Sequence, residues 1–283
     1  MTVATFGYAD TPLGQLHYAE AGEGTPVLLL HQTPRSSDEY REVLPLLARR
    51  RRAIAMDMYG FGLSAKPAPD TEQTIEQYAE GAIALLDALG IGEAVVVGHH
   101  TGSFVASEVA SIAGDRIKAV ILSAAEFADA AFRAAVAQDY DQSGTGPRSS
   151  AGDVDFALPE EDGRHLMVLW GKRYPLYPPG RPDLLDRFVR DALAPGVDPT
   201  EGHRACGRYR MEDRVGLVTA PVLVIANTAD PVSFPHTRMV VEGYAAVTSV
   251  DQVEIPGGTV AVMEHKSEEV VAAIESFLDG QGL

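Results

Sequence analysis

Two adjacent histidines stand in a glycine-flanked turn near the middle of the chain. The turn reads GHHTGS at residues 98–103; it follows the apolar run AVVV at 94–97 and precedes the small-residue stretch FVASEVASIA at 104–113. An apolar run, a glycine turn and small residues in this order predict a strand, a sharp bend and a closely packed helix. His100 lies at the centre of this bend, so its chemistry decides what the chain can do.

An imidazole at such a position suits proton transfer. Histidine has an unperturbed pKa near ~6.5, so it takes up and releases a proton around neutral pH. His100 could act as a general base toward water or an acidic C–H or O–H group, or as a nucleophile that forms a labile acyl-imidazole. The base role needs fewer assumptions. The alternative without function is a histidine that fills a pocket, although a non-glycine residue in a strained bend costs of order 1–3 kcal/mol and is tolerated mainly at functional sites.

The sequence carries no pattern typical of a metal or nucleotide site. His99 and His100 are adjacent on a sharp turn and should point apart, and no H-x-x-x-H or H-E-x-x-H pattern is present. No G-x-G-x-x-G segment follows a strand run, and there is no G-K-[ST] loop. We therefore expect no metal and no cofactor.

Short β-rich runs alternate with helical segments along most of the chain. The runs expected to form strands are residues 15–21, 26–31, 52–57, 94–98, 118–124, 221–226 and 253–256. The helical segments are 38–50, 74–90, the stretch after the turn, and 267–278. This alternation predicts a parallel sheet with right-handed crossovers and helices on both faces.

The alternation stops between residues 127 and 213. This stretch carries the only tryptophan, Trp170, together with several Tyr, Arg, Pro and Gly residues. We expect it to form inserted helices, a lid over the carboxyl edge of the sheet, with a mobile loop at 141–153. The predicted organisation is a core of residues 1–126 and 214–283 with a helical lid of residues 127–213.

The order of these elements resembles the α/β-hydrolase superfamily over about residues 10–280. The matching segments are HYAEAGEGTPVLLLHQTP (17–34), MDMYGFGLSAKP (56–67), VVVGHHTGS (95–103), PVLVIANTADP (221–231) and IPGG (255–258) before an amphipathic helix. The resemblance implies a mostly parallel, twisted sheet flanked by helices, with an inserted helical lid. In this family the turn after the fifth strand is the nucleophile elbow, a strained bend that presents one side chain above the sheet. The resemblance therefore places His100 where the nucleophile stands, and His99 should point back into the fold.

The resemblance also implies the partners of His100. The family's acid usually follows the strand at 221–226, which is the place of Asp230, and in some members it follows the preceding strand, where this chain has Glu126. The family's late histidine is replaced, because Thr259 and Val260 stand where Gly-His is usual. Without a serine hydroxyl and a late imidazole, the ordinary serine-esterase mechanism is excluded at these positions.

Further residues are candidates for oxyanion stabilisation and substrate contact. By resemblance, the oxyanion donors are the backbone N–H groups of Gln32 or Thr33 and of Thr101, and the Gln32 side chain could add a donor. His31 closes a strand and is expected to pack beneath this loop, while Arg35 lies where a substrate carboxylate or enolate could be met. The residues that could line the pocket from the lid are Trp170, Tyr209 and His203. His265, five residues beyond the usual place, could be a displaced partner or a surface residue.

These residues lead to three functional hypotheses. The first is an enzyme that hydrolyses an ester, a lactone or an activated C–C bond of a small, partly apolar carbonyl compound. The second is a lyase, decarboxylase or isomerase that uses the same base and oxyanion hole without a covalent intermediate. The third is a protein that binds a small ligand without chemistry. A small molecule is the expected partner in each case.

Composition narrows the remaining choices. The chain has 283 residues, with 23 Lys and Arg against 40 Asp and Glu, for a net charge of −17. Such an acidic surface repels phosphate backbones and anionic lipids, which argues against nucleic-acid and membrane partners. The single cysteine, Cys206, cannot form an internal disulfide, and no apolar run approaches the ~20 residues that span a bilayer. We expect a cytoplasmic protein; the oligomeric state is not predicted.

Overall fold

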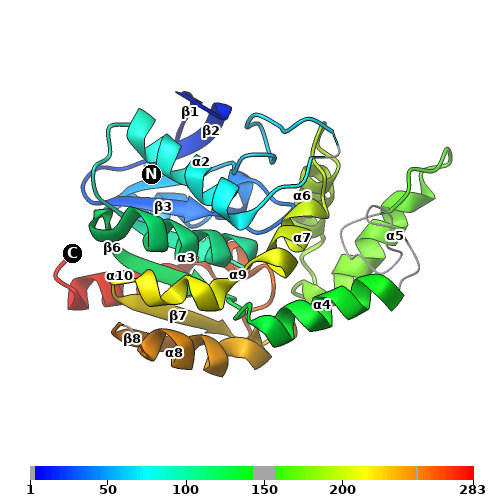
Figure 1. Cartoon of the computed structure of the whole chain (residues 1–283). Helices are drawn as coiled ribbons and strands as arrows, with labels where there is room; N and C mark the ends of the chain where they lie inside the picture. The colour runs from blue at the N-terminus through cyan, green and yellow to red at the C-terminus, as the bar shows by residue number, and fades with distance from the viewer. Residues whose placement is uncertain (1–3, 70, 143–156, 247) are drawn as a thin grey trace.

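An eight-stranded sheet forms the centre of the molecule (Figure 1). The computed structural model describes residues 4–69, 71–142, 157–246 and 248–283, and the side chains of all of these except 137–142. The strands in sheet order are β1 (Thr5–Thr11), β2 (Gly14–Ala21), β4 (Arg52–Met56), β3 (Pro26–Leu30), β5 (Ala94–His99), β6 (Ile117–Ser123), β7 (Val222–Asn227) and β8 (Val250–Ile255). The strands from β4 to β8 along this order are parallel to one another, as the alternating pattern predicted.

The first two strands depart from the parallel arrangement. β1 and β2 form an antiparallel hairpin, and β2 also pairs with β4 in the antiparallel sense. The sequence pattern did not identify β1. Its signals are the β-prone Phe6 and Tyr8 on alternate positions and the tight turn between Thr11 and Gly14, which are paired across the hairpin.

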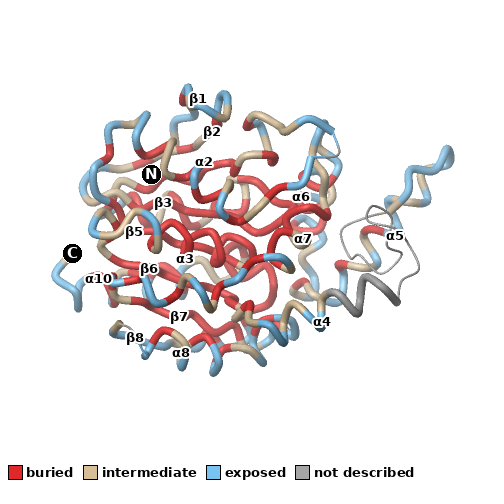
Figure 2. Tube along the Cα trace, viewed as in Figure 1, coloured by how far each residue is buried: buried red, intermediate tan, exposed pale blue. Residues whose placement is uncertain are grey.

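Both faces of the sheet are buried, because helices cover each of them (Figure 2). Along β3, Leu28 and Leu30 belong to one apolar cluster, and Val27 and Leu29 belong to the cluster on the opposite face. Alternate residues of a strand point to opposite faces, so a continuous apolar run is what a doubly covered strand requires.

The helices form a layer on each side of the sheet (Figure 1). The helices whose apolar residues pack into the first cluster are α2 (Ile75–Ala88), α3 (Thr101–Ala113) and α8 (Thr237–Ala245). Those that pack into the second are α1 (Leu44–Leu47), α9 (Val262–His265) and α10 (Ser267–Gly280).

The helix predicted at residues 38–50 is wrong in extent. It is broken into a 3-10 turn at Ser37–Tyr40 and the short α1. Pro45 lacks an N–H and is accommodated only in the first turn of a helix, which accounts for the late start of α1.

A helical insertion lies between β6 and β7, at the side of the sheet where Figure 1 shows α4, α5, α6 and α7. Its helices are α4 (Ala130–Gln142), α5 (Arg164–Arg173), α6 (Pro182–Ala192) and α7 (Glu201–Arg208). α5 and α6 build a small apolar cluster of their own, which includes Leu169, Leu184 and Phe188 and reaches Ala261 of the core, whereas Ala205 and Cys206 of α7 belong to the first core cluster. Most of the loop expected at 141–153 lies outside the described residues, and the division at residues 126 and 214 stays a prediction. No helix in the described part of the chain is long and apolar enough to cross a membrane.

Candidate active site

The bend between β5 and α3 holds His100 in a backbone conformation that side chains rarely adopt. His100 has φ 48° and ψ −116°, and α3 begins at the next residue. The bend is this sharp because strand and helix nearly touch: a Cβ atom on Gly98 would lie 2.0 Å from the Gly102 carbonyl oxygen, and one on Gly102 would lie 2.0 Å from the Leu30 carbonyl oxygen. Only glycine fits at either position. The strain at His100 is of the kind that is kept mainly at functional sites.

The ring of His100 is paired with a carboxylate from the loop after β7. Nε2 of His100 lies 2.7 Å from Oδ2 of Asp230, which makes the contact an ion pair when the ring is protonated. Asp230 is almost completely buried, and its carboxylate accepts hydrogen bonds from the Val232 N–H and from the Ser233 N–H and Oγ–H. These donors fix the carboxylate, so the ring meets a preorganised partner.

The pairing shifts the pKa values of His100 and Asp230 in the directions that favour their charged forms. Burial lowers the pKa of His100, but Asp230 and, more weakly, Glu126 outweigh it, so the pKa lies above the usual value. Burial raises the pKa of Asp230, but His100 and the Ser233 and Val232 hydrogen bonds hold it far below its usual range. A proton on Nε2 faces the carboxylate, which leaves Nδ1 as the nitrogen with a free lone pair when the ring is neutral.

We expect the His100–Asp230 pair to stabilise the fold most strongly between about pH 4 and pH 6.5. The pKa of His100 is raised, so its contribution is complete below the unfolded value and is lost as the pH rises through the folded one. The pKa of Asp230 is lowered, so its contribution is complete above the unfolded value and is lost in acid. Urea midpoints should therefore show a larger cost of His100→Ala at pH 5.5 than at pH 9, and equal costs would contradict the pairing.

A second carboxyl group reaches the same region from the loop after β6. The loop begins at Ala124, whose φ is 51°; Ala124 and His100 are the only non-glycine residues with positive φ in the described ranges. Two residues later, Oε1 of Glu126 lies 3.7 Å from Nε2 of His236. Burial raises the pKa of Glu126 to about 7; His100 opposes this shift and Asp230 adds to it.

A cavity of about 280 Å³ lies between the bend and the helical insertion. The core contributes Gln32, His100, Thr101, Phe104, Glu126, Val232 and Val260, and the insertion contributes Phe132, Val136, Arg173, Leu176, His203 and Cys206. None of these described lining residues is a serine. A mostly apolar wall with a few convergent polar groups is typical of a site for a small molecule.

Two of the backbone amides expected to serve an oxyanion have no acceptor among the described residues. The Gln32 N–H donates to Oε2 of buried Glu39 at 2.8 Å, and the Gln32 side-chain amide donates to Oε1 of Glu39 and to the Val260 carbonyl oxygen. Both donor groups of Gln32 are therefore occupied. The N–H groups of Thr33 and Thr101 donate no hydrogen bond to another of the described residues. Of the expected oxyanion donors, these two remain.

The model of the alpha/beta hydrolase fold family matches residues 25–258. The chain belongs to this family. Among curated α/β hydrolases and their relatives, haloalkane dehalogenase 2 of Mycobacterium tuberculosis is 34% identical over 113 residues, 40% of this chain and 39% of that protein. The 2-hydroxy-6-oxo-6-(2'-aminophenyl)hexa-2,4-dienoic acid hydrolase of Metapseudomonas resinovorans is 35% identical over 112 residues, 38% of each chain. The match thus spans about two fifths of the length of each of these two relatives, and about a fifth of bifunctional epoxide hydrolase 2 of Sus scrofa.

Solved structures resemble this α/β hydrolase over nearly its whole length. An epoxide hydrolase from an endophytic Streptomyces is 26% identical, with a TM-score of 0.70 over 98% of this chain and 96% of the other. The enol-lactonase of Burkholderia xenovorans is 18% identical, with a TM-score of 0.76 over 96% of this chain and 100% of the other. At this identity the enol-lactonase shows the fold alone.

The second histidine of the turn belongs to the core. His99 is fully buried; its Nε2 donates to the Val260 carbonyl oxygen at 2.9 Å, and its Nδ1 lies 3.1 Å from Oγ of Ser123. Burial and the neighbouring His100 lower the pKa of His99 to about 3, so the ring is neutral. Its place explains why two adjacent histidines have different surroundings: one anchors the loop of Val260, and the other faces the cavity.

Several residues singled out from the sequence lie away from the cavity wall. His31 donates from Nδ1 to the Gln32 carbonyl oxygen and accepts the Met58 N–H at Nε2, so it braces the loop after β3. Tyr209 is buried in the core with its hydroxyl on Glu108, and Trp170 packs against the apolar cluster of the insertion. His265 lies with Nε2 3.0 Å from Oγ1 of Thr259. Of the three lid candidates, His203 alone lines the cavity.

Arg35 does not meet the cavity either. Its guanidinium is fully buried, with Nε 2.9 Å from Oδ2 of Asp191 on α6 and Nη1 2.9 Å from Oε1 of Glu264 on α9. It does not reach a substrate in the cavity, because both carboxylates hold it between the insertion and the core. Burial raises the pKa of Glu264 to about 7 against the influence of Arg35 and Arg187.

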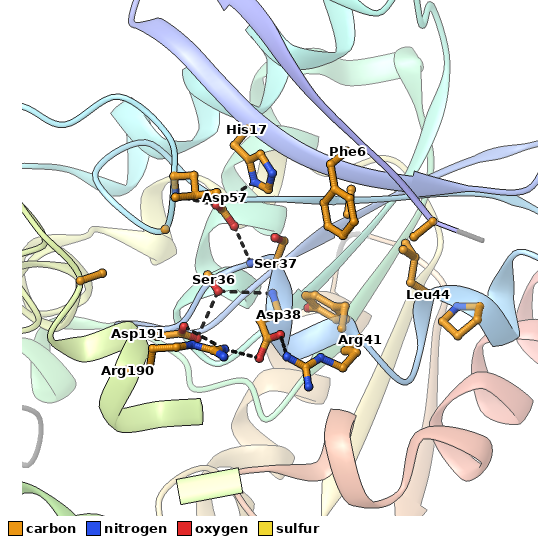
Figure 3. Close-up of a pocket in the computed structure, with 17 residues that line it drawn as sticks. Phe6, His17, Ser36, Ser37, Asp38, Arg41, Leu44, Asp57, Arg190 and Asp191 are labelled. Atoms are coloured by element: carbon orange, nitrogen blue, oxygen red, sulfur yellow. Dashed lines mark hydrogen bonds and ion pairs between the residues drawn. The ribbon is translucent and has the colours of Figure 1, made fainter. Parts of the chain in front are cut away.

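A larger cavity, of about 610 Å³, lies on the other side of this ion-pair cluster (Figure 3). Its polar lining is paired internally: His17 Nδ1 contacts Asp57, the Ser37 N–H donates to Asp57, and Ser36 donates to Asp191. Burial acts to raise the pKa of Asp57, but His17 and backbone N–H groups hold it at about 2. Because its acids are already held by hydrogen bonds and ion pairs, this larger cavity offers fewer reactive groups than the smaller cavity at His100.

Proposed function

We propose that this chain is an enzyme that hydrolyses a small, partly apolar carbonyl compound, an ester, a lactone or an activated C–C bond, with His100 as general base. The observation that carries the proposal is the placement of His100: it lines the cavity from a strained bend and is paired at 2.7 Å with buried Asp230. Relatives named as a dehalogenase, an epoxide hydrolase and a dienoic acid hydrolase are consistent with a small substrate.

The pairing of His100 with Asp230 supports its use in place of a separate serine and histidine. The bend is where α/β hydrolases carry their nucleophile, and Asp230 follows the strand that usually bears the acid. Val260, at the usual place of the late histidine, lines the cavity as an apolar residue. Asp230 therefore meets the ring on the bend directly, so one imidazole holds the proton-accepting role.

In the proposed reaction, Nδ1 of His100 removes a proton from water as the water oxygen attacks the carbonyl carbon. Asp230 stabilises the imidazolium that forms, and the N–H groups of Thr33 and Thr101 stabilise the negative charge on the former carbonyl oxygen. Collapse of the tetrahedral intermediate breaks the bond to the leaving group. No covalent enzyme intermediate is required.

A lyase or isomerase is the second candidate, because no serine lines the described wall of the cavity. Such an enzyme needs a base and an oxyanion hole, and His100 with the two threonine amides meets both needs. Solvent isotope labelling separates the two candidates: hydrolysis incorporates one oxygen from ¹⁸O-water into the product, whereas elimination or isomerisation incorporates none.

His100→Ala should abolish turnover by the purified protein in a panel of small esters, lactones and β-keto acids. Loss of a general base costs typically 10²–10⁴-fold. His165→Ala on α5, away from the cavity wall, is the matched control and should retain activity. Retention of activity by His100→Ala would contradict the proposed role, and mass spectrometry during turnover should find no acyl adduct on His100. If the wild-type protein turns over none of these compounds, the binding hypothesis gains.

A further inference from the structure

Glu126 is the other acid of the cavity, and it is not needed to orient His100. The Asp230 carboxylate already meets Nε2 of His100 and is itself fixed by the Val232 and Ser233 donors. We propose that Glu126 is a second proton-transfer residue, which delivers a proton to the leaving group of the substrate. This inference rests on the proposed function, and assigns the class of substrate: compounds whose leaving group must be protonated as it departs.

The backbone conformation before Glu126 supports a functional rather than an incidental position for its side chain. Ala124 ends β6 with φ 51°, a conformation that costs an L-residue free energy, and its N–H donates to the Ile225 carbonyl oxygen of β7. The core contributes two titratable groups to this cavity, His100 and Glu126. In the described ranges two non-glycine residues have a positive φ: one is His100 itself, and the other, Ala124, lies two residues before Glu126. A bend that serves only to leave the sheet would not require this strain.

The groups around Glu126 hold it in the form that a proton donor needs. His236 lies 3.7 Å away on one side, and His100 and Asp230 act on it electrostatically. The other titratable or charged groups on the cavity wall come from the insertion: Arg173, His203 and Cys206. Burial lowers the pKa of His236, so this neighbour is neutral near pH 7 and does not force Glu126 to ionise. With a pKa raised to about 7, a substantial fraction of the carboxyl is protonated at neutral pH.

The proposed proton transfers balance over one turnover. His100 takes one proton from the attacking water, and the remaining hydroxide adds to the carbonyl carbon. As the bond between that carbon and the leaving group breaks, its electron pair takes the proton of Glu126. The products are a carboxylic acid and a neutral leaving group. The proton on His100 then passes to the Glu126 carboxylate through water in the emptied cavity, which restores both groups.

Glu126→Gln should separate substrates by their leaving group. The amide keeps the size of the side chain but cannot donate a proton to a departing anion, so hydrolysis of methyl acetate should fall by about 10²-fold or more, while that of 4-nitrophenyl acetate should change by less than about threefold. The second leaving group is a stable anion that needs no proton. The alkaline limb of the pH profile for methyl acetate should also disappear in the variant. Glu242→Gln on the exposed side of α8 is the matched control and should change neither rate.

The outcomes distinguish this inference from the proposed function. Equal losses for both esters would make Glu126 a structural residue and overturn the inference, while His100→Ala still tests the base. In carboxyl ¹³C-labelled protein, one of the glutamate resonances that titrate near neutral pH should be missing in Glu126→Gln. This assignment is needed because Glu264 has a similarly raised pKa. If no resonance that is lost in Glu126→Gln titrates near neutral pH, the inference about Glu126 fails whatever the kinetics show. If the wild-type protein hydrolyses neither ester nor any other compound of the panel, the inference fails together with the proposed function.

Discussion

Asp230→Asn is expected to lower kcat/KM by about 10³- to 10⁴-fold for every compound that the wild-type protein turns over. The carboxylate 2.7 Å from Nε2 keeps the ring proton on that nitrogen and supplies the negative charge that stabilises the imidazolium. An asparagine side chain has the same shape but no charge, so both the tautomer and the base strength of His100 are lost. Because Asp230 raises the pKa of His100, the acidic limb of the pH profile should also move to lower pH in the variant.

Ser233→Ala is the control for this substitution. It removes one hydrogen bond to Oδ2 of Asp230, 2.8 Å long, and leaves the charge in place. We expect a reduction of kcat/KM of less than about tenfold, in line with the ~1 kcal/mol of an ordinary hydrogen bond. Initial rates and circular dichroism spectra of both variants provide the measurement. A folded Asp230→Asn variant with wild-type rates would show that the ion pair only stabilises the fold.

Gly102→Ala is expected to cost about 4 kcal/mol or more of unfolding free energy, or to prevent folding. The added Cβ would lie 2.0 Å from the Leu30 carbonyl oxygen and 2.9 Å from that of His31. The first oxygen belongs to the last residue of the central strand β3 and the second to the buried residue that follows it, so neither can move aside easily. Urea denaturation of the purified variant provides the measurement.

A matched glycine tests whether this cost is steric. A Cβ on Gly216 would meet no atom within 4 Å, so Gly216→Ala should change the unfolding free energy by less than about 0.5 kcal/mol. If the two variants have the same urea midpoint, the close approach of α3 to β3 is not what requires glycine at position 102.

The fold could be predicted from the sequence because its signals are local. The parallel strands β3 to β7 are mostly apolar runs, and the small residues at 98, 102 and 103 indicate the close contact of strand and helix. The hairpin partner β1 has a weaker signal, since Phe6 and Tyr8 are largely exposed at the sheet edge. The helix expected at 38–50 is interrupted because Pro45 fits only in the first turn of a helix, so α1 cannot begin further upstream.

The roles within the site depend on distant partners and were harder to predict. Sequence left open whether Gln32 or Thr33 supplies an amide, and our proposal of Thr33 depends on Glu39, whose carboxylate accepts from both donor groups of Gln32. Arg35 seemed available to a substrate because its partners, Asp191 and Glu264, are 156 and 229 residues away in the chain. Spacing within a motif cannot reveal such pairs.

The ion pairs between α6 and the core restrict how a molecule can enter. Arg187 of α6 reaches Asp38 and Glu42 of the core, while Asp191 of the same helix holds buried Arg35. Pulling α6 outward would separate fully buried Arg35 from Asp191, and breaking a buried pair of this kind costs roughly 3–5 kcal/mol. Displacing α6 to admit a molecule is therefore costly, and we expect this helix to stay bound to the core while a ligand enters or leaves the cavity at His100.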